Sequence, residues 1–154
     1  MHFTTALVSL ATVAAGLPNA PQPPSLTYLF AVNITVAAPI VIGTTPLGFR
    51  QVYPITGGTV KGPKLNGTVA NWGGDWGLTD SAGTFRPDAR YIIQSDDGAN
   101  IYVTAQGYAP PGSDFDAQIF ETGSEKYSWL NNALCVSSGE IGDNGVVLQV
   151  WQAT

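Results

Sequence analysis

DARYIIQSDDGANIYVTAQ, residues 88–106, is the most informative stretch of the chain. Two runs rich in β-branched and aromatic residues flank Asp97-Gly98, a pair that strongly favours a β-hairpin. If Asp97 and Gly98 are the two central residues of a type I′ turn, Ile92 faces Val103 and Arg90 faces Ala105. A three-residue turn with a bulge would instead shift this register and exchange the two faces.

The two-residue turn predicts mixed polarity on both faces of the hairpin. One face would carry Asp88, Arg90, Ile92, Gln94, Ile101, Val103 and Ala105, and the other Tyr91, Ile93, Ser95, Tyr102, Thr104 and Gln106. A sheet with one dry and one wet side has a cleaner division, so we expect a partly polar inner side, as in a closed barrel with a lined cavity. The alternative is that the aspartates only form a turn and that Arg90 pairs with Asp88 for structure.

The chain of 154 residues has room for one domain. Residues 1–16, MHFTTALVSLATVAAG, are predicted to be a secretory signal peptide, although no Lys or Arg stands near the start. Residues 17–25 hold four prolines and read as an extended arm, and residues 26–154 form the predicted domain. We therefore expect a secreted, extracellular protein without a membrane segment.

Cleavage of that leader would remove the only histidine and the only methionine. Without imidazole, Ser-His-Asp and Cys-His mechanisms and histidine metal sites are excluded, so acid-base work falls to Asp, Glu, Tyr or Lys. We expect no metal and no organic cofactor, although the pair Asp114 and Asp116 could supply oxygen ligands to calcium. The single cysteine, Cys135, reads as a small buried residue of a strand.

The net charge of −5 and the scattered six Lys and Arg residues argue against nucleic acid as a partner. Two sequons, at Asn33 and Asn66, predict glycosylation if the protein is secreted by an organism that glycosylates. The sequence leaves the oligomeric state open.

Alternation and turn spacing predict an all-β fold. From Tyr28 to Val36, every second residue is apolar or aromatic, and about nine or ten short strands follow one another with one helical turn near residues 125–131. Residues 107–117, GYAPPGSDFDA, read as a loop that could cover a cavity mouth as a lid. These features indicate a single antiparallel β-barrel, lipocalin-like in architecture, with little or no helix.

Spaced blocks along the chain carry a family resemblance. They are Pro54–Thr59, Gly62-Pro63, Leu65–Gly67, Gly74–Trp76, Asp88–Tyr91, Asp96–Ala99, Phe120–Thr122 and Tyr127–Asn131. In that order they resemble the domain of unknown function 3237 family, also called uncharacterised protein family 0311, over Tyr28 to Trp151. The resemblance implies a compact β-barrel with an interior of small-molecule size and no assigned activity, and the leader suits a secreted fungal-type member.

The first group of candidate site residues surrounds Asp75. This carboxylate lies between Trp72 and Trp76 in the sequence, and packing against indoles would remove its hydration and raise its proton affinity. Asp75 is therefore the best candidate base for abstracting a proton next to a carbonyl. The alternative is that the two tryptophans belong to the core and that Asp75 caps a turn.

The hairpin supplies the second group of candidates. Asp88 and Tyr91 are further catalytic candidates, since a tyrosine hydroxyl donates to a carbonyl. Arg90 can hold a carboxylate or enolate oxygen. The predicted ligand-binding residues are Trp72, Trp76, Arg90, Tyr102, Glu121 and Trp129.

Two functions from different classes fit these residues. The favoured one is a small-molecule-binding barrel for an apolar or aromatic carbonyl compound, with cofactor-free isomerase, lyase or cyclase activity as an extension. The alternative is a secreted carbohydrate-binding module that uses the four tryptophans for sugar stacking.

Overall fold

The computed structural model describes residues 22–154, so the predicted signal peptide and most of the predicted arm lie outside the described residues. The described part holds eleven strands and one 3-10 helix. They are β1 (Leu26–Val36), β2 (Ile40–Thr45), β3 (Gly48–Lys61), β4 (Gly67–Asp75), β5 (Leu78–Thr79), β6 (Phe85–Arg86), β7 (Asp88–Ser95), β8 (Asn100–Tyr108), β9 (Ser113–Glu121), η1 (Ser128–Asn132), β10 (Cys135–Gly142) and β11 (Gly145–Ala153).

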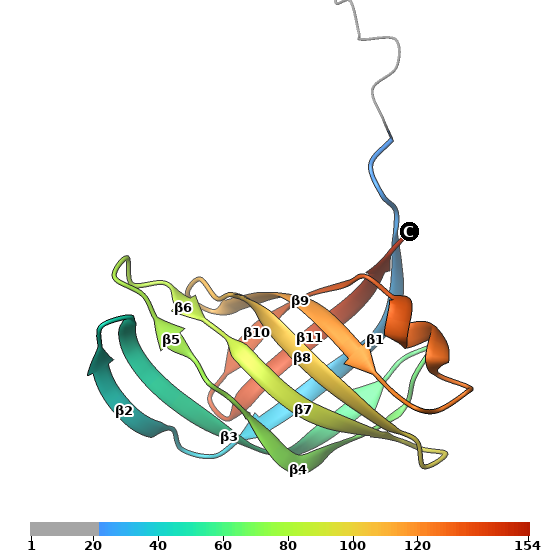
Figure 1. Cartoon of the computed structure of the whole chain (residues 1–154), viewed down its shortest axis with the longest axis horizontal. Helices are drawn as coiled ribbons and strands as arrows, with labels where there is room; N and C mark the ends of the chain where they lie inside the picture. The colour runs from blue at the N-terminus through green and yellow to red at the C-terminus, as the bar shows by residue number, and fades with distance from the viewer. Residues whose placement is uncertain (1–21) are drawn as a thin grey trace, which may run out of the picture.

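Eight of these strands close into an antiparallel barrel in the order β1-β11-β10-β9-β8-β7-β4-β3, with β3 pairing back onto β1 (Figure 1). The closing ladder runs from Ala31 opposite Lys61 to Val36 opposite Ile55. The strands β2, β5 and β6 extend the sheet beyond the barrel from one end of β3. The predicted all-β barrel is therefore confirmed, with slightly more strands than the sequence suggested.

The register of the β7–β8 hairpin differs by one residue from the prediction based on a two-residue turn. Tyr91 faces Val103 and Ile92 faces Tyr102, and the Ser95 N–H donates to the Ala99 carbonyl at 2.9 Å across a three-residue turn. Gly98 has φ +89°, the left-handed conformation that such a turn needs. The prediction of Ile92 opposite Val103 and Arg90 opposite Ala105 is wrong, and the three-residue alternative is confirmed.

This register gives the hairpin one buried face and one outer face. The buried face carries Tyr91, Ile93, Ser95, Ile101, Val103 and Ala105. The polar side chains Asp88, Arg90 and Gln94 lie on the outer face, together with Ile92 and Tyr102. Apolar burial selects this register, because a shift by one residue would turn the three buried side chains of one of the two strands to the outside.

Large apolar side chains fill the barrel toward η1. Phe30 and Phe120 meet edge to face with ring centroids 6.0 Å apart, and Leu130 of η1 is buried against the same core. Figure 1 shows η1, in orange, beside the end of β9. Cys135 is also buried, and burial raises the pKa of its thiol to about 11, as expected for an inert core cysteine.

The predicted lid at residues 107–117 is mostly strand. β8 continues to Tyr108 and β9 begins at Ser113, so only residues 109–112 form the connecting turn. On the outer face Tyr108 and Phe115 stack with centroids 5.5 Å apart, which favours continued pairing on both sides of the two prolines. Asp114 and Asp116 therefore alternate with Phe115 on a strand and point inward.

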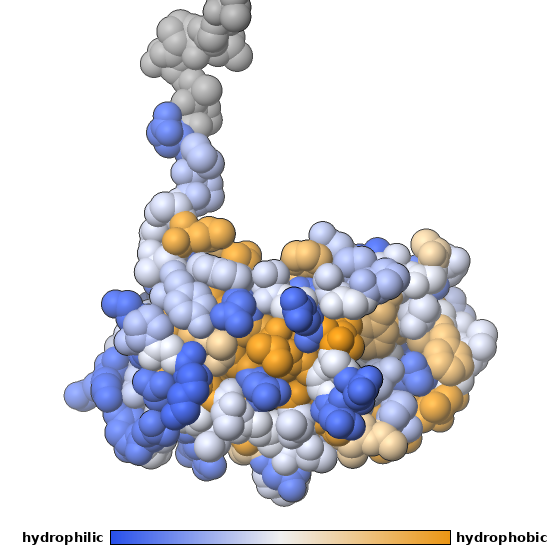
Figure 2. Space-filling view, turned by 180° about the vertical axis from the view of Figure 1, so that it is seen from behind, coloured by the Kyte–Doolittle hydropathy of each residue, from blue (hydrophilic) through white to orange (hydrophobic). Residues whose placement is uncertain are grey.

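Some large apolar side chains remain outside, among them Leu47, Trp72, Ile119 and Leu134. Figure 2 shows apolar and polar residues mixed over the surface seen from behind. Within residues 22–154, no helix is long and apolar enough to cross a membrane.

Candidate functional site

The end of the barrel away from η1 contains a cavity of about 420 Å³, a volume within the range of small-molecule sites. Its walls come from most strands of the barrel and from the β5–β6, β8–β9 and β10–β11 turns. Ile34, Ile55 and Leu148 form apolar wall, and aromatic surface comes from Tyr53, Phe85 and Tyr91. The charged lining consists of Asp75, Asp114, Asp116 and Asp143.

Two of these carboxylates are placed inside by the alternation of β9. Every second residue of β9 is buried, and the buried residues are Asp114, Asp116, Gln118 and Phe120. Asp114 and Asp116 are each only 6% exposed. The Oδ1 atom of each has no hydrogen-bond partner among the described residues, so both atoms are available to a bound molecule.

Burial and mutual repulsion give these carboxyl groups different proton affinities. Burial, followed by the charges of Asp114 and Asp75, raises the pKa of Asp116 to about 8. Burial and the charge of Asp75 raise the pKa of Asp114 to about 6. Near neutral pH the carboxyl groups of Asp114 and Asp116 therefore hold protons that solvent-exposed carboxyl groups would have lost.

Asp75 faces the same cavity from the end of β4. Its Oδ1 accepts a 2.8 Å hydrogen bond from the Asp88 backbone N–H. Burial nevertheless raises the pKa of Asp75 to about 6, while Arg50 acts in the opposite direction as a weaker influence. Burial and the nearby Asp75 also raise the pKa of the Tyr53 hydroxyl, so that Tyr53 remains a neutral donor.

Tyr91 begins a buried polar chain beneath the cavity. Its hydroxyl donates to Gln118 Oε1 at 3.5 Å, and Gln118 Nε2 donates to Ser137 Oγ at 2.9 Å. Burial, with the charges of Asp116 and Asp114, raises the pKa of Tyr91 far above its usual value. Tyr91 is therefore a neutral hydroxyl held next to the carboxyl pair.

The structure brings only Asp75 and Tyr91 of the predicted catalytic residues into the cavity lining. The Asp88 side chain points outward, where its Oδ1 lies 3.2 Å from Arg90 Nη1 and accepts a 2.8 Å hydrogen bond from Gln106 Nε2. The contribution of Asp88 to the site is its backbone N–H, which holds Asp75.

The predicted ligand contacts of β4 and β7 also lie outside. The Arg90 guanidinium covers the Trp76 ring at 5.5 Å from its centroid, on the outer face of the barrel. Trp72 is 77% exposed. Neither tryptophan packs on the Asp75 carboxyl from inside the cavity, since neither belongs to its lining.

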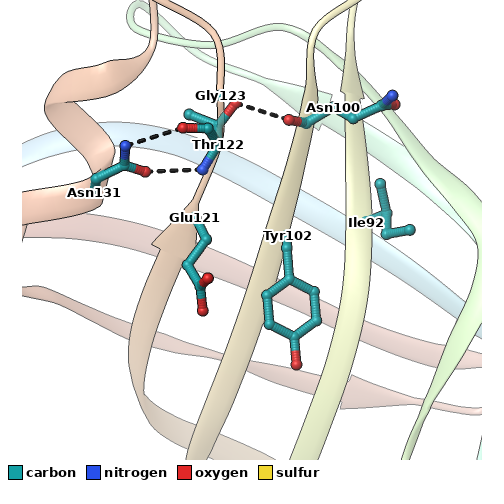
Figure 3. A pocket seen from close by; sticks show the side chains of 7 residues that line it. All are labelled: Ile92, Asn100, Tyr102, Glu121, Thr122, Gly123 and Asn131. Atoms are coloured by element: carbon teal, nitrogen blue, oxygen red, sulfur yellow. Dashed lines mark hydrogen bonds between the residues drawn. The ribbon is translucent and has the colours of Figure 1, made fainter.

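Tyr102 and Glu121 face each other across β8 and β9 in a separate open depression on the outer surface (Figure 3). Three of its residues bond to one another: Asn131 exchanges hydrogen bonds of 2.8 and 3.0 Å with the Thr122 backbone, and the Thr122 hydroxyl donates to the Asn100 carbonyl at 2.8 Å. Glu121 is exposed to solvent in this depression, whereas the carboxyl groups of Asp114 and Asp116 are buried in the barrel cavity.

The remaining predicted residues are dispersed. Trp129 of η1 is half-buried against the core at the closed end of the barrel. Asn33 and Asn66, the predicted glycosylation sites, are both exposed, although the Asn66 amide also bonds to the Gly62 backbone. Glycosylation at both positions stays a prediction.

Sequence reasoning missed the inward Asp114 and Asp116, which it considered only as loop ligands for calcium. Among the described residues, no three His, Cys, Asp or Glu side chains lie close enough to hold a metal ion. The sequence signal for these inward positions was the alternation of Asp114, Asp116, Gln118 and Phe120 with other residues, which is typical of a strand. The adjacent Pro110-Pro111-Gly112 indicated a loop instead.

Comparisons with known proteins agree with this architecture. The chain is 39% identical to the "Hydroalkoxylation enzyme phnH" of Penicillium herquei over 154 residues, covering 99% of both chains, and 32% identical to a UPF0311 protein of Clostridium acetobutylicum, covering 80% of this chain and 90% of the relative.

Two solved structures share the barrel. A "beta-barrel like protein" of Acinetobacter baumannii has a TM-score of 0.82 at 32% identity, with 88% of this chain and 99% of that chain covered. An "enzyme from Penicillium herquei" has a TM-score of 0.74 at 35% identity, with 90% and 100% covered. The family described as "Protein of unknown function (DUF3237)" matches residues 24–119 and 115–153. The chain therefore belongs to this family, as the resemblance in its sequence predicted.

Proposed function

We propose that the barrel cavity catalyses the addition of a hydroxyl group across a carbon–carbon double bond within one aromatic carbonyl compound, which forms a cyclic ether. The name of the Penicillium relative supports this class of reaction. The observation that carries the proposal is the pair of buried carboxyl groups of Asp114 and Asp116, which point from β9 into one cavity and whose pKa values are both raised by burial. Such a pair supplies an acid and a base at the same pH.

The two carboxyl groups divide the proton transfers between them. Asp114 removes the proton of the substrate hydroxyl while Asp116 donates its proton to the carbonyl oxygen conjugated with the alkene. The hydroxyl oxygen bonds to the β-carbon, the electron pair of the carbon–carbon double bond forms a new double bond between the α-carbon and the carbonyl carbon, and the π pair of the carbonyl binds the proton from Asp116, which gives an enol. The enol returns its O–H proton to Asp116, and Asp114 gives the other proton to the α-carbon. Both carboxyl groups are restored, and no oxidant or reductant is consumed.

Neighbouring residues would support this pair. Asp75 repels the charge of both carboxyl groups and so contributes to their raised pKa values. Tyr91 donates its one hydroxyl proton to Gln118, which is held by Ser137, so the Tyr91 oxygen would accept a hydrogen bond from the substrate. The reaction is an isomerisation and a cyclisation, two of the classes expected from the sequence.

A test uses 2′-hydroxychalcone, which carries a phenol, an enone and two aromatic rings and closes to flavanone. We expect the protein to form flavanone with an excess of one enantiomer, measured by chiral chromatography against the racemic product of buffer alone. Asp116→Asn should lower the rate at least about 100-fold, the usual contribution of a general acid. Asp96→Asn is the matched control, because Asp96 is an exposed residue of the β7–β8 turn. A racemic product at the rate of buffer alone would contradict the proposal.

The predicted secretion and glycosylation belong to the same proposal. The apolar segment 1–16 and the exposure of Asn33 and Asn66 support an extracellular enzyme.

A further inference from the structure

We infer that the same cavity binds aromatic amines in their ammonium form, with the amine hydrogen-bonded to Asp114 and Asp116 and the ring against the aromatic wall. This inference goes beyond the proposed reaction and does not depend on it. It concerns a class of ligand rather than a class of reaction.

The uncompensated charge of the cavity is the first observation. Four Asp side chains line it, and none of the described lining residues is Lys, Arg or His, so each of them that ionises has no opposite charge in the lining. Arg50 donates to the Trp76 carbonyl, and Arg90 lies on the outer face of the barrel over the Trp76 ring. A positively charged ligand would therefore supply the opposite charge that the lining residues do not provide.

The unused hydrogen-bonding capacity is the second observation. Asp114 and Asp116 occupy successive inward positions of β9, so their Cα atoms are roughly 7 Å apart. Both Oδ1 atoms are buried without a hydrogen-bond partner in the described part of the chain. An ammonium group has three donors and no acceptor, so it can satisfy both atoms at once.

The aromatic wall is the third observation. Tyr53, Phe85 and Tyr91 line the cavity, and the rings of Tyr53 and Phe85 meet edge to face at 5.9 Å. Aromatic faces attract cations and pack against planar rings.

A matched series of indoles tests the charge preference. Tryptamine is a cation, tryptophol is its neutral alcohol and indole-3-propionate is an anion. At pH 7.5, isothermal titration calorimetry should give an affinity for tryptamine at least about 10-fold above that for tryptophol. This factor corresponds to the free energy that hydrogen bonds to charged groups usually contribute. Indole-3-propionate should bind most weakly. Equal affinities for tryptamine and tryptophol, or tighter binding of the anion, would overturn the inference.

The affinity for tryptamine should rise between pH 5.5 and 8, because ionisation of Asp114 and Asp116 creates the charges that the amine pairs with. The ligand stays protonated throughout this range. The other titratable or charged groups near the carboxylates are Arg50 and Tyr53 on β3, Asp75 on β4, Asp88 and Tyr91 on β7, and Asp143 in the β10–β11 turn. Binding should release protons, so the observed heat should vary with the ionisation enthalpy of the buffer. An affinity that falls with pH would contradict the inference.

Variants separate this site from non-specific attraction to an acidic protein. Asp114→Asn should lower the affinity for tryptamine about 10-fold or more and change that for tryptophol far less. Asp96→Asn removes the same charge from the exposed β7–β8 turn and should leave both affinities unchanged. Circular dichroism confirms folding of each variant, and the pH dependence of the unmodified protein provides a test without any substitution. Loss of binding in both variants alike would overturn the inference, whereas failure of flavanone formation would affect only the proposed reaction.

Discussion

Asp116 makes the stability of the protein depend on pH. Its pKa of about 8 in the folded state exceeds the ordinary value of 3.8, so between these values the folded protein holds a proton that the unfolded chain has lost. The free energy of unfolding therefore falls as pH rises from about 4 to 8, by roughly 1.4 kcal/mol for each unit of pKa difference as an upper limit.

Asp116→Asn should remove the part of this dependence that Asp116 contributes, while Asp75 and Asp114, whose pKa values are also raised, still contribute theirs. We expect the variant to unfold at a higher temperature than the unmodified protein at pH 8.5, by several degrees for about 2 kcal/mol, and to show little or no such gain at pH 4. Differential scanning calorimetry at the two pH values measures the difference. An equal effect at both pH values would show that the carboxyl charge is not the cause.

At the level of single residues, the sequence predicted the environment of Asp75 better than that of its neighbours. Burial does raise the pKa of Asp75, although the indoles do not line its cavity. The positions of Arg90 and Asp88 could not be predicted, because the side on which a strand residue lies depends on a register that changes with one residue of turn length. The inward positions of Asp114 and Asp116 were not predicted, because the two prolines before them indicated that the loop continues to residue 117, where the structure has β9.

The turn of the β7–β8 hairpin gives a prediction for a single element. Gly98 has φ +89°, and a Cβ atom added there would have no heavy atom within 4 Å, so Gly98→Ala introduces backbone strain without a steric clash. We expect a loss of about 1–2 kcal/mol in the free energy of unfolding, measured by urea denaturation. Gly123→Ala is the control, because Gly123 also has open space and does not need a positive φ. Equal losses would contradict the assigned turn.

The existence of this hairpin followed from local sequence, whereas its turn length did not. Ser95-Asp96-Asp97-Gly98-Ala99 is compatible with a two-residue or a three-residue turn. The choice is made by the burial of Tyr91, Ile93 and Val103 inside the barrel, which is a tertiary effect.

Closure of the barrel gives a prediction for the whole molecule. Gly58 faces Ile34 in the β1–β3 ladder, and a Cβ atom there would lie 2.0 Å from the Asn33 carbonyl oxygen. Gly58→Ala should therefore push the closing strands apart. Gly57→Ala is a close control, because Gly57 also has a positive φ but its nearest contact would be 3.6 Å away.

We expect Gly58→Ala to lower the free energy of unfolding by about 1–3 kcal/mol more than Gly57→Ala does, the usual range for overpacking. Urea denaturation followed by tryptophan fluorescence measures both variants. Similar losses would show that backbone strain, and not the close approach of β1 and β3, accounts for the two glycines.

The sequence indicated a barrel through turn spacing and alternation, but not which strands close it. The β1–β3 ladder joins segments separated by β2, and a pairing of this kind leaves no local signal. The two-residue strands β5 and β6 are too short for a period to be recognised.

The pairing of the chain ends has a mechanical consequence. Ser25 and Thr154 exchange backbone hydrogen bonds of 2.8 and 2.9 Å, and Leu26 stands opposite Ala153 at the start of the β1–β11 ladder. A force that separates the two ends acts across this ladder, perpendicular to its strands and parallel to its hydrogen bonds. The bonds are then loaded one after another from the end, so the barrel unzips under tension instead of shearing as a unit.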